Sequence, residues 1–516
     1  MLDCCLYKFR CVVADYFTAL VTPAKRRLTT REKMKTLHTN LKMALTVGLV
    51  ALLAGCAGTR TVDQKTAAAD LANSNFKAYA QKYLDGKGKP VYDATSLLDT
   101  LEAGKAFNDA GMWQLSKEAF AAASTMMMWK EDTVATPEGI TRLVGTTLTN
   151  DTLGPYTGKI YQGGMIDYYQ AMNSLMLGDE AGSRVNFNRV AVRQDNAVKQ
   201  LEAFAKSTDD SIKEGMGEKG GETAQQSLAG IAPKLADGKQ DLPSGLSKAK
   251  MRNASADFMS AIFRSTSGSP QDKSVALGPL KNAGTAASTQ GGASLVGQLT
   301  RNLQASGGEI KNKVIVVYED GIGPGFSEFR IDLPLFLVTS KVTYTGIALP
   351  KFQAGQPALG GLKVGPKGDS TVVMTNMNEL VGLEFDAAYR GIVAKAVLST
   401  IIKTVAQAAV NTAIDKQAGN NALGGLLKLG TGAAQAALTK ADTRSWVNLP
   451  NTIQIAYLDR PSNGTLQVGT DGGRALATVQ LESAPNNLVV IKASGPGGRP
   501  AIYTQPLPAL KPAIGL

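Results

Sequence analysis

The sequence predicts an α+β protein, with helical hairpins first and a mostly antiparallel β-region, interrupted by a helical block, second. Three observations lead to this fold class. Up to about residue 283, apolar residues recur at the spacing of amphipathic helices. From Lys313 onward, short runs of β-branched residues are separated by glycine and proline, as in strands joined by turns. Inside that β-region, residues 385–440 return to helical spacing.

The helical part contains two hairpins of similar pattern, which turn at Gly111 and Gly178. In each hairpin small residues alternate with aromatic ones such as Phe120 and Phe187, so that two helices can approach closely while the rings fill the space between them. The turn glycines are 67 positions apart, which is close to two periods of about 34 residues. The hairpins therefore resemble tetratricopeptide (TPR) repeats. A weaker hairpin at 256–280 matches helical spacing only.

The β-region and its helical block complete the expected organisation. Lys395 and Lys403 interrupt the apolar core of the block, which argues against a membrane span and favours packing on the strands. Strands are expected at 314–318, 329–333, 342–349, 370–375, 452–458, 466–468, 475–481 and 488–492. The expected parts are an upstream extension (1–33), a signal peptide (34–55), a tether (56–66), a TPR-like helical domain (67–283), a linker (284–312), a β-rich domain (313–505) with its helical insertion (385–440), and a Pro-rich tail (506–516).

The leader predicts an exported protein that is anchored by lipid. Residues 34–42 are short and basic, and residues 43–53 are apolar but too few to span a bilayer as a helix. They end in Leu53-Ala54-Gly55-Cys56, which resembles the lipobox of bacterial lipoproteins. The resemblance implies a diacylglycerol thioether on Cys56 and cleavage of the peptide bond before it. The alternatives are an ordinary signal peptide or a buried apolar helix with an incidental cysteine.

The residues on either side of the lipobox refine this prediction. Position 57 is alanine and not aspartate, which by resemblance to proteobacterial sorting rules implies the outer membrane, facing the periplasm. In a Gram-positive organism this last inference does not apply. Residues 1–33 precede the expected start at Met34, either as an annotation artefact or as a cytoplasmic extension of the signal.

The rare reactive residues all lie in or next to the leader. The four cysteines and the single histidine, His38, occur within the first 56 positions. Removal of residues 1–55 would leave Cys56 as the one thiol and no imidazole, which excludes Ser-His-Asp and Cys-His catalysis, His-ligated metals and a disulfide framework. It would also take nine of the 55 Lys and Arg and three of the 43 Asp and Glu, so that the net charge falls from +12 to +6. Because no basic run remains, no nucleic-acid partner is expected.

Three candidate chemistries follow from loops in the sequence. The loop 321–325 is glycine-rich but leads into an extended segment, and Glu319 and Asp320 would repel a phosphate. Residues 154–160 are one residue short of a Walker A loop. Glu319, Asp320 and Glu328 could form a hard-cation site or a general acid/base pair, but a charged β-turn is favoured because no spaced ligand loop is present. We therefore assign no catalytic residue, no metal and no cofactor.

A basic helix face is the one candidate binding site. Four residues of a predicted helix are related by steps of four or five positions, which places them on one side of that helix. They are Arg184, Asn188, Arg189 and Arg193. They could line a groove that accepts a peptide carboxylate or an extended backbone, as TPR-like arrays do. A solvated basic face is the favoured alternative.

Several segments together resemble an uncharacterised family of proteobacterial lipoproteins with TPR-like helices followed by a β-region. They are the lipobox, the hairpin 168–193, the turn 321–324, Ile347-Ala-Leu-Pro350 and the segment 442–450. The resemblance implies no established activity. We expect a non-enzymatic, outer-membrane-anchored scaffold or adaptor for cell-envelope proteins. The alternatives are a cell-wall or glycan-active enzyme that uses carboxylates, and an activator of a cell-wall synthase.

Overall fold

The computed structural model describes residues 62, 64–134, 156, 158–215, 228–332, 346–418 and 440–508. The expected leader at 1–55 and Cys56 lie outside the described residues, as do 57–61 and 63 of the expected tether; the end of that tether, from Gln64, is already part of a helix. The chain from Gly58 to Leu516 forms one compact unit, to which every described residue belongs.

The first described helices contain both expected hairpins. Helix α5 turns into α6 at Gly111, and α8 turns into α9 at Gly178; both glycines have a positive φ, 76° and 67°, which residues with a Cβ rarely adopt. The two hairpins are confirmed as helical pairs, whereas their TPR-like character stays a prediction. The bounds are α3 Gln64–Ala72, α4 Phe76–Gln81, α5 Leu97–Asp109, α6 Trp113–Val134, α8 Ile160–Met176 and α9 Glu180–Gly215.

A second group of helices leads to the first strand and corrects one expectation. The segment 284–312, expected to be a linker, holds α14, a 16-residue helix. Thr289 caps this helix by accepting a hydrogen bond from Gly292 N, and Val296, Leu299 and Leu303 form its buried stripe. The sequence suggested a linker because the positions around these apolar residues are rich in glycine, alanine and serine. The bounds are η4 Ala232–Lys239, η5 Lys248–Met251, α11 Ala254–Thr266, α12 Pro270–Ser274, α13 Gly278–Ala286 and α14 Gln290–Ala305.

The strands form three sheets within the described residues. A five-stranded sheet has the order β11-β10-β1-β7-β6, a four-stranded sheet has the order β5-β4-β8-β9, and β2 pairs with β3. Among the strands that the structure describes, β1 and β10 are the one parallel pair, so that the mostly antiparallel β-region is confirmed. The bounds are β1 Lys313–Asp320, β2 Gly325–Asp332, β3 Gly346–Gln353, β4 Leu362–Val364, β5 Asp369–Ser370, β6 Val372–Asn376, β7 Thr452–Asp459, β8 Thr465–Thr470, β9 Ala475–Gln480, β10 Asn486–Ala493 and β11 Ala501–Leu507.

The expected helical block is a single long helix, α15, at Met377–Ala418. It begins directly after β6, eight residues earlier than expected, and residues 419–439 of the expected block lie outside the described residues. Among the described helices, including α15 with its 42 residues, none combines the length and the apolar character that a membrane crossing requires.

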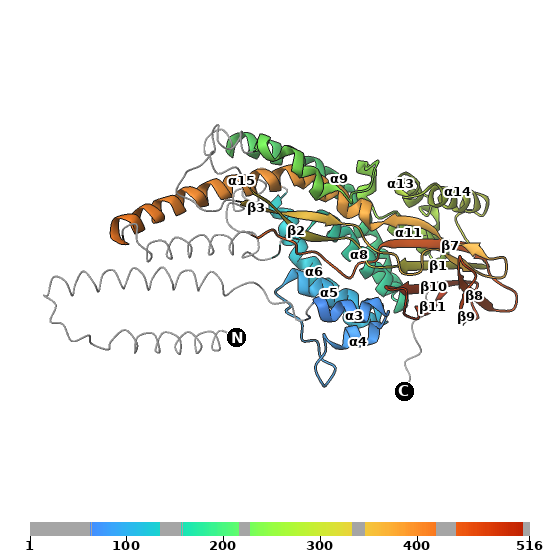
Figure 1. The fold of residues 1–516 in the computed structure, drawn as a ribbon. Coiled ribbons are helices and arrows are strands. Elements are labelled where there is room, and N and C mark those ends of the chain that lie inside the picture. The colour runs from blue at the N-terminus through green and yellow to red at the C-terminus, as the bar shows by residue number, and fades with distance from the viewer. Residues whose placement is uncertain are drawn as a thin grey trace. The chain divides into compact units, whose positions relative to one another are not determined.

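Both faces of the five-stranded sheet are buried. Successive side chains of its central strand, β1, point to opposite faces, and each face packs into a different core. Ile315 and Val317 of β1 belong to the core shared with the helices, whereas Val314 and Val316 belong to the core shared with the four-stranded sheet. Helix α11 packs against β6 and β7 of this sheet, and Figure 1 shows α11 beside β7. The helical region expected at 67–283 and the β-region expected at 313–505 therefore share one core and do not form separate domains.

Candidate functional site

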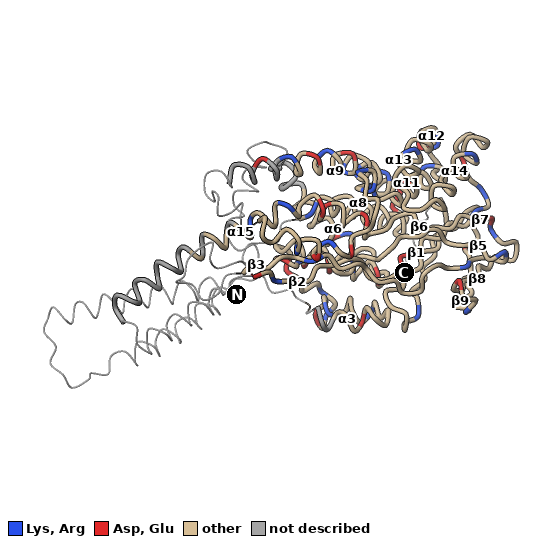
Figure 2. The backbone as a smooth tube through the Cα atoms, turned by 45° about the horizontal axis from the view of Figure 1, so that its top comes forward, with Lys and Arg blue, Asp and Glu red and all other residues tan. Residues whose placement is uncertain are grey.

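The four residues predicted to bind a peptide lie on α9, and the structure pairs them with side chains of the same chain. Arg184 Nη2 lies 2.6 Å from Asp272 Oδ2 and 2.8 Å from Glu180 Oε1. Asn188 Oδ1 accepts a hydrogen bond from Arg264 at 2.5 Å. Figure 2 shows both basic and acidic residues along α9.

The other two arginines converge on one buried carboxylate of α8. Arg193 Nη1 lies 3.1 Å from Asp167 Oδ2, and Arg189 Nη2 lies 3.4 Å from Asp167 Oδ1. Both guanidinium groups also donate to Ser124 Oγ of α6, at 2.5 Å and 3.2 Å. The side chain of Asp167 is fully buried and that of Arg193 is 9% exposed, so Arg193 is not part of a solvated face. These arginines join α6, α8 and α9, and their peptide-binding role stays a prediction.

A buried ionic cluster, which the sequence did not predict, joins the helices to the central sheet. We define it as Lys105 and Asp109 of α5, Glu319 of β1 and Lys492 of β10, whose side chains are 2–6% exposed. Lys492 Nζ lies 2.9 Å from Asp109 Oδ1 and 3.4 Å from Glu319 Oε2. Lys105 Nζ lies 3.0 Å from Glu319 Oε2 and also pairs with Asp109. The cluster holds two cations and two carboxylates, and is therefore balanced in charge.

The opposite charges around Glu319 and Lys492 favour the ionised form of these two residues in spite of their burial. Burial opposes the charge of Glu319, but the ammonium groups of Lys105 and Lys492 outweigh it and hold the pKa of Glu319 below its usual value. Burial also opposes the charge of Lys492, but Asp109 and Glu319 outweigh it and raise the pKa of Lys492. A carboxylate with a lowered pKa is a weak base, so Glu319 is poorly suited to general-base catalysis at neutral pH.

The space beside the ionic cluster is too small for a substrate. A cavity of about 10 Å³ is lined by all four of its members and by Asn448. That volume is about the minimum that one water molecule needs. The cluster therefore acts in the described structure as an internal bridge between α5 and the central sheet.

The other two carboxylates that the sequence suggested, Asp320 and Glu328, accept hydrogen bonds within the chain. Asp320 Oδ1 accepts from the Tyr318 hydroxyl at 2.6 Å and from the backbone N–H groups of Ala358 and Leu359 at 3.0 Å and 2.9 Å. Glu328 accepts from Arg330 at 2.9 Å and from the backbone of Ala441 at 2.8 Å. Glu319 and Asp320 are the last two residues of β1 and are buried, so the charged β-turn that the sequence favoured is wrong for these two residues. Within the described residues, no group of three or more His, Cys, Asp or Glu is placed to hold a metal ion.

The glycine-rich loop after β1 uses its backbone donors internally. Gly321 N donates to Ala493 O at 2.7 Å, Ile322 N to Gln356 O at 2.9 Å, and Gly323 N to Leu449 O at 2.7 Å. Gly321 has a φ of 77°, and a Cβ there would lie 2.0 Å from Gln356 O. Because these N–H groups are bonded to carbonyl groups of the same chain, they do not form a phosphate cradle.

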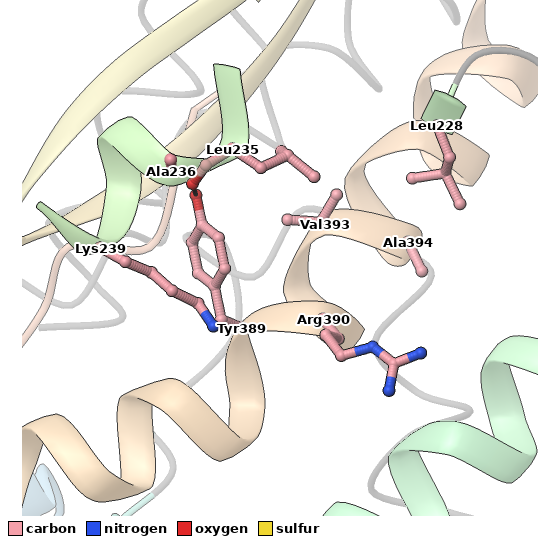
Figure 3. Close-up of a pocket in the computed structure, with 8 residues that line it drawn as sticks. All are labelled: Leu228, Leu235, Ala236, Lys239, Tyr389, Arg390, Val393 and Ala394. Atoms are coloured by element: carbon pink, nitrogen blue, oxygen red, sulfur yellow. Dashed lines mark hydrogen bonds between the residues drawn. The ribbon is translucent and has the colours of Figure 1, made fainter. Parts of the chain in front are cut away.

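One apolar cleft of about 410 Å³ lies between η4 and one face of α15. The hydroxyl of Tyr389 donates to Leu235 O at 3.2 Å, and Lys239 Nζ lies 5.3 Å from the centre of the Tyr389 ring. Gly238 permits this close approach, because a Cβ there would lie 1.9 Å from the Tyr389 hydroxyl oxygen. The cleft is lined by Leu228, Leu235, Ala236, Lys239, Tyr389, Arg390, Val393 and Ala394, as Figure 3 shows.

Comparison of the chain with protein-family models, with curated proteins and with solved structures gives no match. The functional argument therefore depends on the residues themselves. Sequence reasoning missed both the ionic cluster and the cleft. One signal was present for the cluster: Lys492 interrupts a run of apolar strand residues at 488–491, a position where a lysine needs a buried partner.

Proposed function

We propose that this protein is an outer-membrane lipoprotein, anchored through Cys56 and facing the periplasm, that acts as a non-enzymatic scaffold or adaptor for envelope proteins. The lipobox at 53–56 supports the anchor and the address. Several acyl chains on one cysteine would hold the chain stably, since each buried methylene contributes about 0.8 kcal/mol.

The observation that carries the scaffold role is the internal use of the carboxylates on which the enzymatic alternative depends. Glu319 is held by Lys105 and Lys492, and Asp320 is bonded to a tyrosine hydroxyl and two backbone N–H groups. The cavity beside Glu319 has room for about one water molecule and not for a glycan. Because these carboxylates are already bonded within the chain, we favour a protein that binds partners through its surface over an enzyme that hydrolyses a glycan.

The anchor is tested by metabolic labelling with a palmitate analogue and by membrane fractionation. We expect the wild-type protein to carry the label and to fractionate with the outer membrane, and Cys56→Ala to lose both properties. Thr61→Ala is the matched control, because Thr61 lies in the expected tether close to Cys56 but offers no thiol, so its loss should change neither property. An unlabelled, soluble wild-type protein would contradict the anchor.

The scaffold role is tested separately by chemical crosslinking in intact cells, followed by purification of the wild-type protein and of Cys56→Ala. We expect envelope proteins to be recovered with the anchored form and lost with the unanchored form. If the purified protein instead releases fragments from peptidoglycan, and Glu319→Gln or Asp320→Asn stops the release, the enzymatic alternative holds. If it increases the turnover of a purified cell-wall synthase, it is an activator.

A further inference from the structure

We propose that the cleft between η4 and α15 binds a single-chain anionic amphiphile, namely a long-chain fatty carboxylate. The chain would lie against Leu235 and Val393, and the carboxylate would lie at the margin formed by Arg390. This site is separate from Cys56 and from the scaffold role, and it does not depend on either.

The lining of the cleft selects for an apolar ligand body. Aliphatic side chains and the ring of Tyr389 form most of its wall. Figure 3 shows Leu235 of η4 and Val393 of α15 pointing toward the same space. On α15, Tyr389 and Arg390 lie one turn before Val393 and Ala394, so one helix face supplies half of the lining. Ligand pockets typically combine such apolar walls with a few polar groups that orient the ligand.

The charged groups of the lining select for an anionic head group. Lys239 and Arg390 are the charged residues among those that line the cleft, and both are cations. Lys239 Nζ lies 2.5 Å from Asp386 Oδ1, and Arg390 is exposed and extends from α15 away from Tyr389. A guanidinium group has five donors in a planar fork, so it can bind a carboxylate in addition to a contact within the chain. An amphiphile with a carboxylate next to its chain therefore matches the site.

The volume of the cleft limits the ligand to one chain. About 410 Å³ lies near the lower end of the range of about 300–1,000 Å³ for small-molecule sites. At about 30 Å³ for a group the size of a water molecule, the cleft holds about fourteen such groups, and a methylene is of similar size. A chain of about a dozen carbons fills this space, whereas a two-chain phospholipid exceeds it.

Contacts within the chain hold the two walls of the cleft together. The Tyr389 hydroxyl bonds to Leu235 O, and Lys239 pairs with Asp386. Those contacts hold η4 on α15 without a ligand. A ligand would therefore enter a preformed site and would not need to separate the two helices.

The first test measures binding of myristate to the full-length protein in a steroid detergent, whose rigid rings do not mimic an acyl chain. We expect saturable binding of one myristate per chain in isothermal titration calorimetry. Hexanoate should bind at least about tenfold more weakly, because it buries fewer methylenes. Tetradecanol, which has the chain but no charge, should bind about three- to tenfold more weakly than myristate. Absence of saturable binding, or equal affinity for myristate and hexanoate, would overturn the proposal.

The second test uses variants of the lining with matched controls. Val393→Trp should fill the cleft and reduce the affinity for myristate at least about tenfold, whereas Ala181→Trp on the exposed face of α9 should not change it. Arg390→Gln should lower the affinity for myristate to that for tetradecanol, whereas Arg301→Gln, an exposed arginine of α14, should leave both affinities unchanged.

Folding is checked by thermal melting of each variant. If Val393→Trp does not fold, Ala394→Leu provides a smaller obstruction at the next residue of the same wall. Unchanged binding in a folded filling variant would place myristate elsewhere and overturn the site. Vesicles of phosphatidylglycerol form the last arm: if they displace myristate at equal chain concentration, the site takes a two-chain lipid and the single-chain proposal is wrong.

Discussion

Lys492 Nζ of β10 lies 2.9 Å from Asp109 Oδ1 of α5, although the two residues are 383 positions apart in the chain. Both side chains are almost fully buried, and Lys492 also contacts Glu319 of the neighbouring strand. Two ions taken out of water are stable only if they are paired and bonded, because the loss of hydration is large. The pair therefore joins α5 to the central sheet, together with the bridge from Lys105 of α5 to Glu319 of β1.

Replacing Lys492 by methionine should strongly destabilise the protein. The substitution keeps the length of the side chain but leaves Asp109 and Glu319 with Lys105 as their shared cation. Removal of one partner of a buried pair costs about 3–5 kcal/mol, which should appear as a lower midpoint of urea unfolding. A second substitution, Glu319→Gln, in the same chain should recover part of the loss, since it removes the unbalanced carboxylate.

Lys313→Met is the matched control for this prediction. Lys313 lies on β1 and pairs with Asp459, whose side chain is 74% exposed. Exposed ion pairs contribute about 0–1 kcal/mol, so the midpoint should change little. An equal loss in the two single variants would contradict the special role of the buried ionic cluster.

The sequence predicted those parts of the fold whose structure depends on residues close together in the chain. The hairpins at Gly111 and Gly178 were found because a left-handed turn needs glycine and because apolar spacing marks the helices on each side. Strand β11 was missed because Pro506 lies in it and made the segment look like an unstructured tail. That proline is tolerated because β11 is the edge of its sheet, where one side of the strand needs no partner.

The candidate site was less predictable because its contacts are distant in the sequence. Helical spacing correctly placed Arg184 and its neighbours on one helix, but it contained no information on Asp272, which is 88 positions away. The same holds for the cleft, whose walls come from η4 and from α15, more than a hundred residues later. Local patterns predict elements, whereas the partners of a charged side chain depend on how those elements pack.

Gly111→Ala should destabilise the first hairpin. Gly111 has a φ of 76°, and a Cβ there would lie 2.6 Å from the ring of Tyr503. The left-handed conformation alone costs about 1–2 kcal/mol for a residue with a Cβ, and the contact with the ring adds to that cost. Thermal melting should therefore show a lower midpoint. Gly86→Ala, where no atom lies within 4 Å of the added Cβ, should leave the midpoint unchanged or slightly raised.

Glu384→Ala should loosen the start of α8. The carboxylate of Glu384, on α15, accepts hydrogen bonds from the backbone N–H groups of Ile160 and Tyr161 at 3.0 Å and 3.2 Å. These donors have no partner inside the helix, and loss of such a cap costs about 0.5–2 kcal/mol. Amide hydrogen exchange should become faster at 160–163. Glu202→Ala removes an exposed carboxylate and should not change exchange there; equal exchange in the two variants would refute the cap.

Asp257 should make the stability of the protein depend on pH between 7 and 5. Burial raises the pKa of Asp257 from 3.8 to about 6, although Arg252 lies beside it and opposes the shift. Because the folded state holds the proton more tightly than the unfolded state, this group stabilises the fold more as the pH falls from 7 toward its unfolded pKa. The contribution between pH 7 and pH 5 is about 1 kcal/mol, close to one unit of pKa.

The variant Asp257→Asn isolates this contribution, because it keeps a hydrogen-bonding group of the same shape but cannot titrate. Urea unfolding at pH 7 and pH 5 gives the difference in free energy of unfolding between wild type and variant at each pH. That difference should move by about 1 kcal/mol in favour of the wild type at pH 5. The contributions of other groups that titrate in this range cancel in the difference between the two proteins, since both proteins contain those groups. If the difference is the same at both pH values, Asp257 does not take up a proton in the folded state, and its pairing with Arg252 dominates over its burial.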